Sequence, residues 1–134
     1  MNKIFTVSGK RKRAIAKATI SPGNGVVKIN NVLIDLIQPG ISRAKMQEPL
    51  IIAGSLANSV DIDIKVEGGG INSQADAIRL AIAKSILAFS KDAKLKKEFM
   101  NYDRQLLVAD VRRKESSKPN RHSQARAKRQ KSYR

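Results

Sequence analysis

Residues 60–70, VDIDIKVEGGG, decide the fold of this chain. From Val60 to Glu67 apolar and charged residues alternate strictly, which predicts a β-strand with one buried face and one face in water. Three glycines then turn the chain. From Ile78 to Phe89 apolar residues recur every three or four positions, which predicts a helix with one apolar stripe. A half-buried strand that leads through a tight turn into an amphipathic helix is therefore the central unit of the domain.

Upstream of this unit, short β-prone segments alternate with turn signals. Pro22–Gly25 is a strong turn sequence, and Asn30-Asn31 suits a two-residue hairpin because asparagine tolerates positive φ. A helix is expected over residues 43–57, with a start or a kink at Pro49. The upstream strands are expected at residues 4–8, 14–21, 26–29 and 32–34.

Downstream, Ser73 is the expected cap of the central helix, and Asp76 suits the positive end of that helix. A second, more basic helix over residues 91–101 should bury Leu95 and Phe99. Strands followed by helices predict an α/β domain of the two-layer α+β type. We expect a mostly antiparallel sheet with helices on one face.

Charge divides the chain more sharply than hydropathy does. The 134 residues have a formal net charge of +16 and no cysteine. Residues 1–17 hold six basic residues and no acidic one, and residues 111–134 hold ten basic residues against Glu115. The remaining 93 residues hold eleven basic and ten acidic residues. We therefore expect a globular domain over residues 1–110, with a basic N-terminal segment at 1–17, and an extended basic tail over residues 111–134.

This distribution indicates a polyanionic partner. Residues 111–134 contain too little apolar surface to offset the entropy of ordering them, so they should take up a fixed shape only against that partner. Their serine, asparagine, glutamine and tyrosine residues suit irregular RNA better than regular duplex DNA. An anionic membrane surface is the weaker alternative. No apolar stretch approaches the roughly 20 residues of a membrane span, and the lack of cysteine fits a cytosolic protein.

Three groups of residues have side chains or spacings that occur in catalytic or ligand sites, but none predicts a catalytic or metal site. The Gly68–Ser73 loop is a near miss for a nucleotide-binding loop, although such a helix start can meet an RNA phosphate. Asp61 and Asp63 have the spacing of a solvated strand face. His122 lies in the tail without an acidic partner. An RNA-processing enzyme that uses the glycine loop, and a non-specific DNA binder, remain the two rival functions.

Several motifs, in order along the chain, resemble one family. The sequence has Gly9-x-Arg11-Lys12-x-Ala14-x-Ala16, then Ser21-Pro22-Gly23-x-Gly25 and Lys28-Ile29-Asn30, then Val66-x-Gly68-Gly69-Gly70 with Gln74-Ala75-x-Ala77-Ile78-Arg79, then Asp110-x-Arg112 and the ending Gln130-Lys131-Ser132-Tyr133-Arg134. Together they are similar to the ninth small-subunit ribosomal protein family, the universal S-nine family. The ending resembles the archaeal and eukaryotic branch. Val111 stands where the family has proline, residues 116–124 lack its glycines and aromatics, and Arg129 replaces an aromatic residue or proline.

The resemblance implies a structural, non-enzymatic protein of the cytoplasmic ribosome without cofactors or metal. It implies a fold like the second domain of ribosomal protein S-five, ribosomal RNA and neighbouring small-subunit head proteins as partners, and a tail that reaches P-site transfer RNA. No membrane partner is expected. The expected ribosomal RNA contacts are Lys10, Arg11, Lys12, Arg13, Arg112, Arg113, Lys114, Lys118, Arg121, Arg126, Lys128 and Arg129. The expected transfer RNA contacts are Lys131, Ser132, Tyr133 and Arg134.

Overall fold

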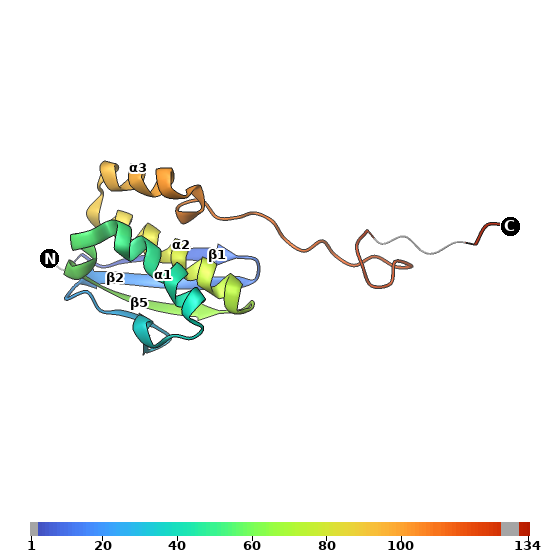
Figure 1. Ribbon diagram of the computed structural model, residues 1–134, viewed down its shortest axis with the longest axis horizontal. Helices are drawn as coiled ribbons and strands as arrows, with labels where there is room; N and C mark the ends of the chain where they lie inside the picture. The colour runs from blue at the N-terminus through green and yellow to red at the C-terminus, as the bar shows by residue number, and fades with distance from the viewer. Residues whose placement is uncertain (1–2, 127–131) are drawn as a thin grey trace.

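A computed structural model describes residues 3–126 and 132–134 of the chain. It is an α+β domain in which helices lie over one face of a five-stranded mixed sheet (Figure 1). The strands are β1 (Phe5–Arg11), β2 (Ala14–Pro22), β3 (Val27–Ile29), β4 (Val32–Leu33) and β5 (Val60–Glu67). The helices are α1 (Gly40–Ala53), α2 (Ile71–Ser90) and α3 (Ala93–Tyr102), with short 3-10 turns η1 (Ile34–Leu36), η2 (Gly54–Ser59) and η3 (Arg104–Leu106).

The strand predicted from residues 60–67 is the centre of the sheet, whose order is β1-β2-β5-β3-β4. Ile62 and Ile64 are buried on its inner face, as the alternation predicted. Strand β5 pairs antiparallel with β2 and parallel with β3. A parallel pair needs a crossover connection, and the chain between β3 and β5 supplies it through β4, η1, α1 and η2. Three of the four strand pairings are antiparallel, so the expected mostly antiparallel sheet is confirmed.

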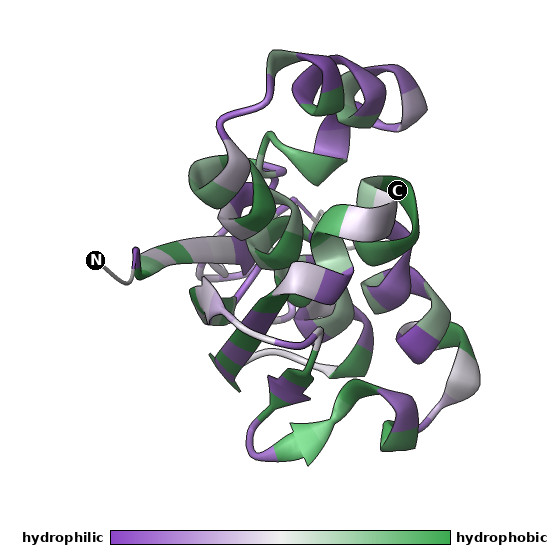
Figure 2. Cartoon of the chain, turned by 90° about the vertical axis from the view of Figure 1, so that its left-hand side faces the viewer, coloured by the Kyte–Doolittle hydropathy of each residue, from purple (hydrophilic) through white to green (hydrophobic). Residues whose placement is uncertain are grey.

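Helix α2 packs on β1 and β2, while α1 and α3 pack beside it. Its inner side is largely alanine and isoleucine, so it lies close to the sheet. The approach is closest at Gly9, where a Cβ atom would stand only 2.3 Å from the carbonyl oxygen of Ala77. Hydrophobic and hydrophilic residues alternate along the strands and helices, in keeping with a sheet that is covered on one side (Figure 2).

The hairpin predicted at Asn30-Asn31 forms between β3 and β4, with φ values of 49° and 66° at the two asparagines. The side-chain amide of Asn30 also continues the pairing of β3 with β5. Its Nδ2 donates to the carbonyl oxygen of Val66 at 3.2 Å, and its Oδ1 accepts from the backbone N–H of Val66 at 3.1 Å. One asparagine therefore acts in the turn and in the sheet ladder together.

The basic N-terminal segment is part of the domain, because residues 5–17 form β1, the turn after it and the start of β2, where strands were expected. Two local expectations were wrong in detail. Helix α1 begins at Gly40 and carries Pro49 inside it, in a buried position. Ser73 does not cap α2, because Gly68 and Gly69 turn the chain early enough for the helix to begin at Ile71 after an extended Gly70. Leu95 and Phe99 are buried in α3, as expected.

Candidate nucleic-acid interface

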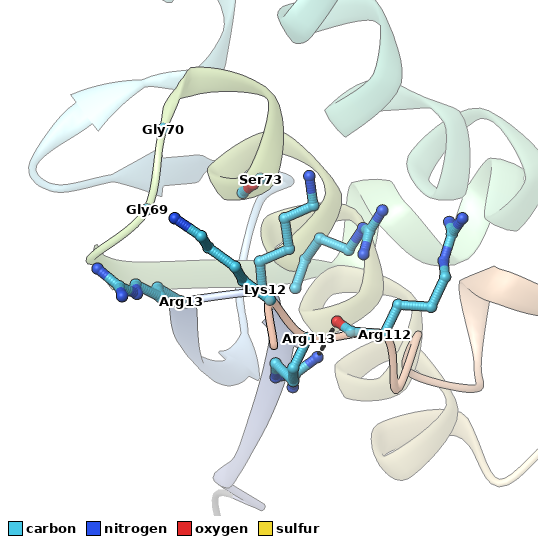
Figure 3. Close-up of a pocket in the computed structure, with 9 residues that line it drawn as sticks. Lys12, Arg13, Gly69, Gly70, Ser73, Arg112 and Arg113 are labelled. Atoms are coloured by element: carbon cyan, nitrogen blue, oxygen red, sulfur yellow. Dashed lines mark hydrogen bonds between the residues drawn. The ribbon is translucent and has the colours of Figure 1, made fainter. Parts of the chain in front are cut away.

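The two cationic blocks, which are about 100 residues apart in sequence, meet at one cleft. The cleft has a volume of about 660 Å³. Three segments surround it: the β1–β2 turn, the glycine loop before α2, and the chain that follows η3 (Figure 3). We call it the basic cleft, and its lining residues are Arg11, Lys12, Arg13, Gly69, Gly70, Ser73, Arg112, Arg113 and Lys114. Six of these nine residues are cationic.

Glycine allows the loop to lie directly against the hairpin turn. Gly68 and Gly69 have φ values of +77° and +67°, which favour glycine. A Cβ atom on Gly68 would stand 2.5 Å from the carbonyl oxygen of Arg13, and one on Gly69 would stand 3.0 Å from Ala14. The glycines of the loop therefore allow it to pack closely against the β1–β2 turn. Helix α2 begins directly after the loop, and its first turn contributes Ser73 to the lining, so the positive end of the α2 dipole lies at the cleft.

Asp110 joins the two cationic blocks. Its Oδ2 lies 3.2 Å from Nη1 of Arg11 on β1 and 2.7 Å from Nη2 of Arg112. The Nε of Arg112 also donates to both carboxylate oxygens, at 3.1 and 2.9 Å, and its backbone N–H donates to Oδ1 at 2.9 Å. These hydrogen bonds from Arg112, helped by the charge of Arg11, hold the pKa of Asp110 far below its usual value. The chain beyond the domain is thus tied to β1 where it leaves the cleft.

Asp110 balances only part of the charge in the basic cleft. It pairs with Arg11 and Arg112, and the latter's pKa is raised by this contact. Within residues 3–126 and 132–134, the side chains of Lys12, Arg13 and Lys114 form no ion pair. Unpaired cations around a concave surface attract an anion, and a low-dielectric wall strengthens that attraction.

The expected contact residues do not all line the basic cleft. Lys10 points to the opposite face of the sheet from Gly9 and Arg11, because successive side chains on a strand alternate. Lys118 and Arg126 lie farther along the tail, where both pair with Glu115 and lower the pKa of its carboxyl group; Arg126 makes the closer contact, at 2.7 Å.

Residues 111–126 contain no helix or strand and lead away from the domain (Figure 1). Most of their side chains are exposed, with Arg121 half-buried. Ser132, Tyr133 and Arg134 are exposed as well. The expected contacts Lys128, Arg129 and Lys131 lie outside the described residues. In the described part of the chain, no helix is long and apolar enough to cross a membrane.

Of the acidic residues Asp61 and Asp63, the first has a structural role. Oδ1 of Asp61 accepts the backbone N–H groups of Asn24 and Val26, both at 2.9 Å. These two bonds are also the main reason that the pKa of Asp61 is lowered. Asp61 therefore organises the turn at Pro22–Gly25, whereas Asp63 is exposed on the outer face of β5, as expected for a solvated strand face. His122 is exposed in the tail.

The cations of the basic cleft are evident from the sequence, whereas the part played by Asp110 is not. The only available signal was the Asp110-x-Arg112 spacing, which places a carboxylate two residues before a guanidinium. That spacing allows local pairing but says nothing of Arg11. The glycine loop resembles a nucleotide-binding loop in sequence, and in the structure cations from two distant segments surround it.

A small α+β domain that displays unpaired cations in a cleft and continues into a basic segment belongs to the class of polyanion-binding proteins. Comparison with known proteins narrows this class. The model of the family described as ribosomal protein S9/S16 matches residues 9–134. The chain is 50% identical over 132 residues to the small ribosomal subunit protein uS9 of Methanothrix thermoacetophila, covering 98% of this chain and 99% of that protein. It is 47% identical over 133 residues to the proteins of that name from Methanococcus maripaludis strains C7 and C5, with coverage of 98% and 99% in each comparison.

The chain therefore belongs to the ribosomal protein S9/S16 family. It is a structural constituent of the small ribosomal subunit and not an enzyme, and its place is the cytoplasmic ribosome. The resemblance to the S-nine family and to its archaeal branch is confirmed.

Proposed function

We propose that this chain binds ribosomal RNA of the small subunit by contacting its phosphates in the basic cleft. The observation that carries the proposal is the convergence of six cationic side chains from both ends of the chain on one cleft, where two carboxylates, those of Asp110 and Asp76, pair with only Arg11 and Arg112 among the six. Arginine presents a planar fork that matches phosphate oxygens, and lysine adds a mobile charge. The fold thus concentrates charge that the sequence carries in two separate blocks.

The tail extends the same proposal beyond the domain. Residues 111–126 are mostly exposed and lack regular structure, and they include Lys118, Arg121 and Arg126. A segment of this kind gains order by releasing counterions from RNA rather than by burying apolar surface. In this proposal Lys128 and Arg129 continue the same series of ribosomal RNA contacts.

The salt dependence of RNA binding tests the basic cleft. Each phosphate that is neutralised adds about 0.7–0.9 to the slope of log affinity against log salt concentration. Replacing Lys12, Arg13 and Lys114 together by glutamine should lower the slope for small-subunit RNA by about 2. The control variant replaces Lys94, Lys96 and Lys97 on α3, which are also exposed and change the net charge equally. An equal loss of slope in both variants would refute a specific role for the basic cleft.

We further propose that the last residues contact P-site transfer RNA. The support is the QKSYR ending of residues 130–134, which resembles the family's ending. Arg134 would bind a phosphate of the anticodon stem-loop, with Lys131, Ser132 and Tyr133 nearby. Arg134→Ala should weaken transfer RNA binding to the P site of assembled small subunits, whereas Arg126→Ala should leave it near normal. Failed assembly of the Arg134 variant, with transfer RNA binding intact, would reject this role.

Contacts with neighbouring proteins of the small-subunit head form the last part of the proposal. Leu36 and Ile51 are 67% and 75% exposed, and Ile51 lines a groove of about 360 Å³ between α1 and the β3 side of the sheet. Exposed apolar residues beside a groove indicate a protein contact better than an RNA contact. Ile51→Asp should weaken incorporation into small subunits without changing the affinity for free RNA. A parallel fall in RNA affinity would contradict this assignment.

A further inference from the structure

A second cationic surface lies on the sheet face that points away from the helices. The strand register places Ser8 of β1 beside Lys17 of β2, and Lys17 beside Lys65 of β5. All three side chains are exposed, between residues that point into the core. They form one row across three neighbouring strands, which we call the lysine row.

The pairing of Lys17 with Lys65 is electrostatically unfavourable for the free protein. Like charges directly opposite each other on neighbouring strands destabilise a sheet. The nearest acidic residues on the same face of β5 are Asp63 and Glu67. In the described ranges 3–126 and 132–134, however, neither lysine of the row forms an ion pair. Two adjacent ammonium groups therefore face solvent without an ion-pair partner among the described residues, although Glu67 lies on the same face.

The surface beside the lysine row is hollow. A depression of about 360 Å³ is lined by Lys17, Lys65, Glu67 and the Asn30-Asn31 turn. It exists because β3 ends at Ile29, so that the turn, instead of a further strand residue, borders β5 at this point. The side-chain amide of Asn30 is bonded to the backbone of Val66, whereas the side chain of the exposed Asn31 forms no hydrogen bond within residues 3–126 and 132–134.

We infer that the lysine row and its hollow form a second binding site for a phosphate of the RNA backbone, separate from the basic cleft. A phosphate in the hollow would lie between the two ammonium groups, while hydroxyl and amide groups such as those of Ser8 and Asn31 would meet ribose or phosphate oxygens. The row itself is polar, and Ile15 on the same face of β2 is 36% exposed, against 67% for Leu36, so RNA fits this surface better than a protein partner does.

The inference deepens the proposed RNA-binding function and rests on it. Lys10 and Lys17 share the open face of the sheet, and the hairpin turn after Lys10 leads directly to Lys12 in the basic cleft. RNA that occupies the cleft can therefore continue over the end of the hairpin onto the lysine row. The domain would then contact RNA on two sides.

A charge-matched pair of variants tests the lysine row. Lys17→Gln with Lys65→Gln should lower the slope of log affinity against log salt concentration by about 1.5 for small-subunit RNA. Lys94→Gln with Lys96→Gln removes the same charge from α3 and should lower it by much less. Because the first variant also removes a like-charge pair, its urea midpoint should equal or exceed that of the wild type. A lower midpoint, or equal slopes in the two variants, would overturn the inference.

Site-directed cleavage distinguishes RNA from protein as the occupant. The chain has no cysteine, so Ser8→Cys provides a unique attachment point for iron–EDTA. In assembled small subunits this probe should cut ribosomal RNA strongly, and more than a probe at Asn101→Cys on α3. Absence of cuts from position 8, or cross-links from it to protein alone, would overturn the inference. If the wild-type chain itself fails to bind small-subunit RNA, the proposed function fails first.

Discussion

Gly9→Ala should destabilise the domain far more than an ordinary glycine-to-alanine exchange. Gly9 lies on β1 where α2 crosses the strand. A Cβ atom there would stand 2.3 Å from the carbonyl oxygen of Ala77 and 2.7 Å from the backbone nitrogen of Ala81. The first distance falls short of a 3.0 Å contact by about 0.7 Å. Because both obstacles are backbone atoms of one helix, no side chain can move aside, and β1 must separate from α2.

The expected size of the effect follows from two opposing contributions. Overpacking a core costs about 1–3 kcal/mol, and backbone obstacles place this site at the upper end of that range. Alanine also restricts the unfolded chain, which favours folding by about 0.4–1 kcal/mol. The net loss should therefore be about 2 kcal/mol. For a domain of roughly 100 residues, this corresponds to a fall in Tm of about 8–16 °C.

Urea and thermal unfolding, followed by circular dichroism, measure this loss. Gly40→Ala is the matched control, because Gly40 begins α1 and a Cβ atom there would meet only the end of the Arg43 side chain, at 3.7 Å. That variant should be neutral or slightly more stable, since alanine favours the helix. If Gly9→Ala unfolds at the same urea concentration as Gly40→Ala, the packing argument for β1 on α2 is wrong.

Three further predictions concern hydrogen bonds and pH. Asn30→Gly keeps the positive φ but loses both bonds to Val66, so it should cost about 1–3 kcal/mol in urea unfolding, against a few tenths for Asn31→Gly. Arg79 donates to Glu48 at 2.6 Å and to Asp103 at 2.9 Å, so Arg79→Met should lower the free energy of unfolding by about 1–2 kcal/mol, a value discounted for partial exposure. A loss below about 0.5 kcal/mol, as for an ordinary surface substitution, would contradict this prediction. Burial would raise the pKa of Asp103, but the backbone N–H of Gln105 and the Arg79 guanidinium lower it. A carboxyl group with a lowered folded-state pKa stabilises the fold at pH values above its unfolded pKa of about 3.9, and this stability is lost as the pH falls through the folded-state pKa. The urea midpoint should therefore decrease as the pH is lowered beneath about 4, and it should decrease less steeply in Arg79→Met.

Local pattern was enough to predict most of the elements. The alternation over residues 60–67 predicted β5, and helical spacing predicted α2 and the buried Leu95 of α3. Both patterns depend only on neighbours within a few positions, which is why sequence alone resolves them. The start of α2 was misplaced because serine is a common cap, whereas here three glycines permit an earlier start.

The residues of the basic cleft were predicted, but their meeting was not. Charge counting marked residues 1–17 and 111–134 as two cationic segments at opposite ends of the chain. The two segments differ in structure because, in residues 5–17, apolar and small residues alternate with polar and cationic ones, and β1 and β2 bury them against α2. Basic residues that alternate with core residues, as in residues 5–17, belong to strands. The basic residues of 111–126 have no buried apolar neighbours, and this segment forms no strand.

By itself, the sequence determined the basic character of this protein, its central strand, its amphipathic helices and its resemblance to a family. Tertiary structure alone decided that the two cationic blocks share one cleft, that Asp110 joins them, and that Lys17 lies beside Lys65. The reason is physical. Periodicity is a property of neighbouring residues, whereas strand order and register result from the packing of the whole chain, and they alone bring distant charges together.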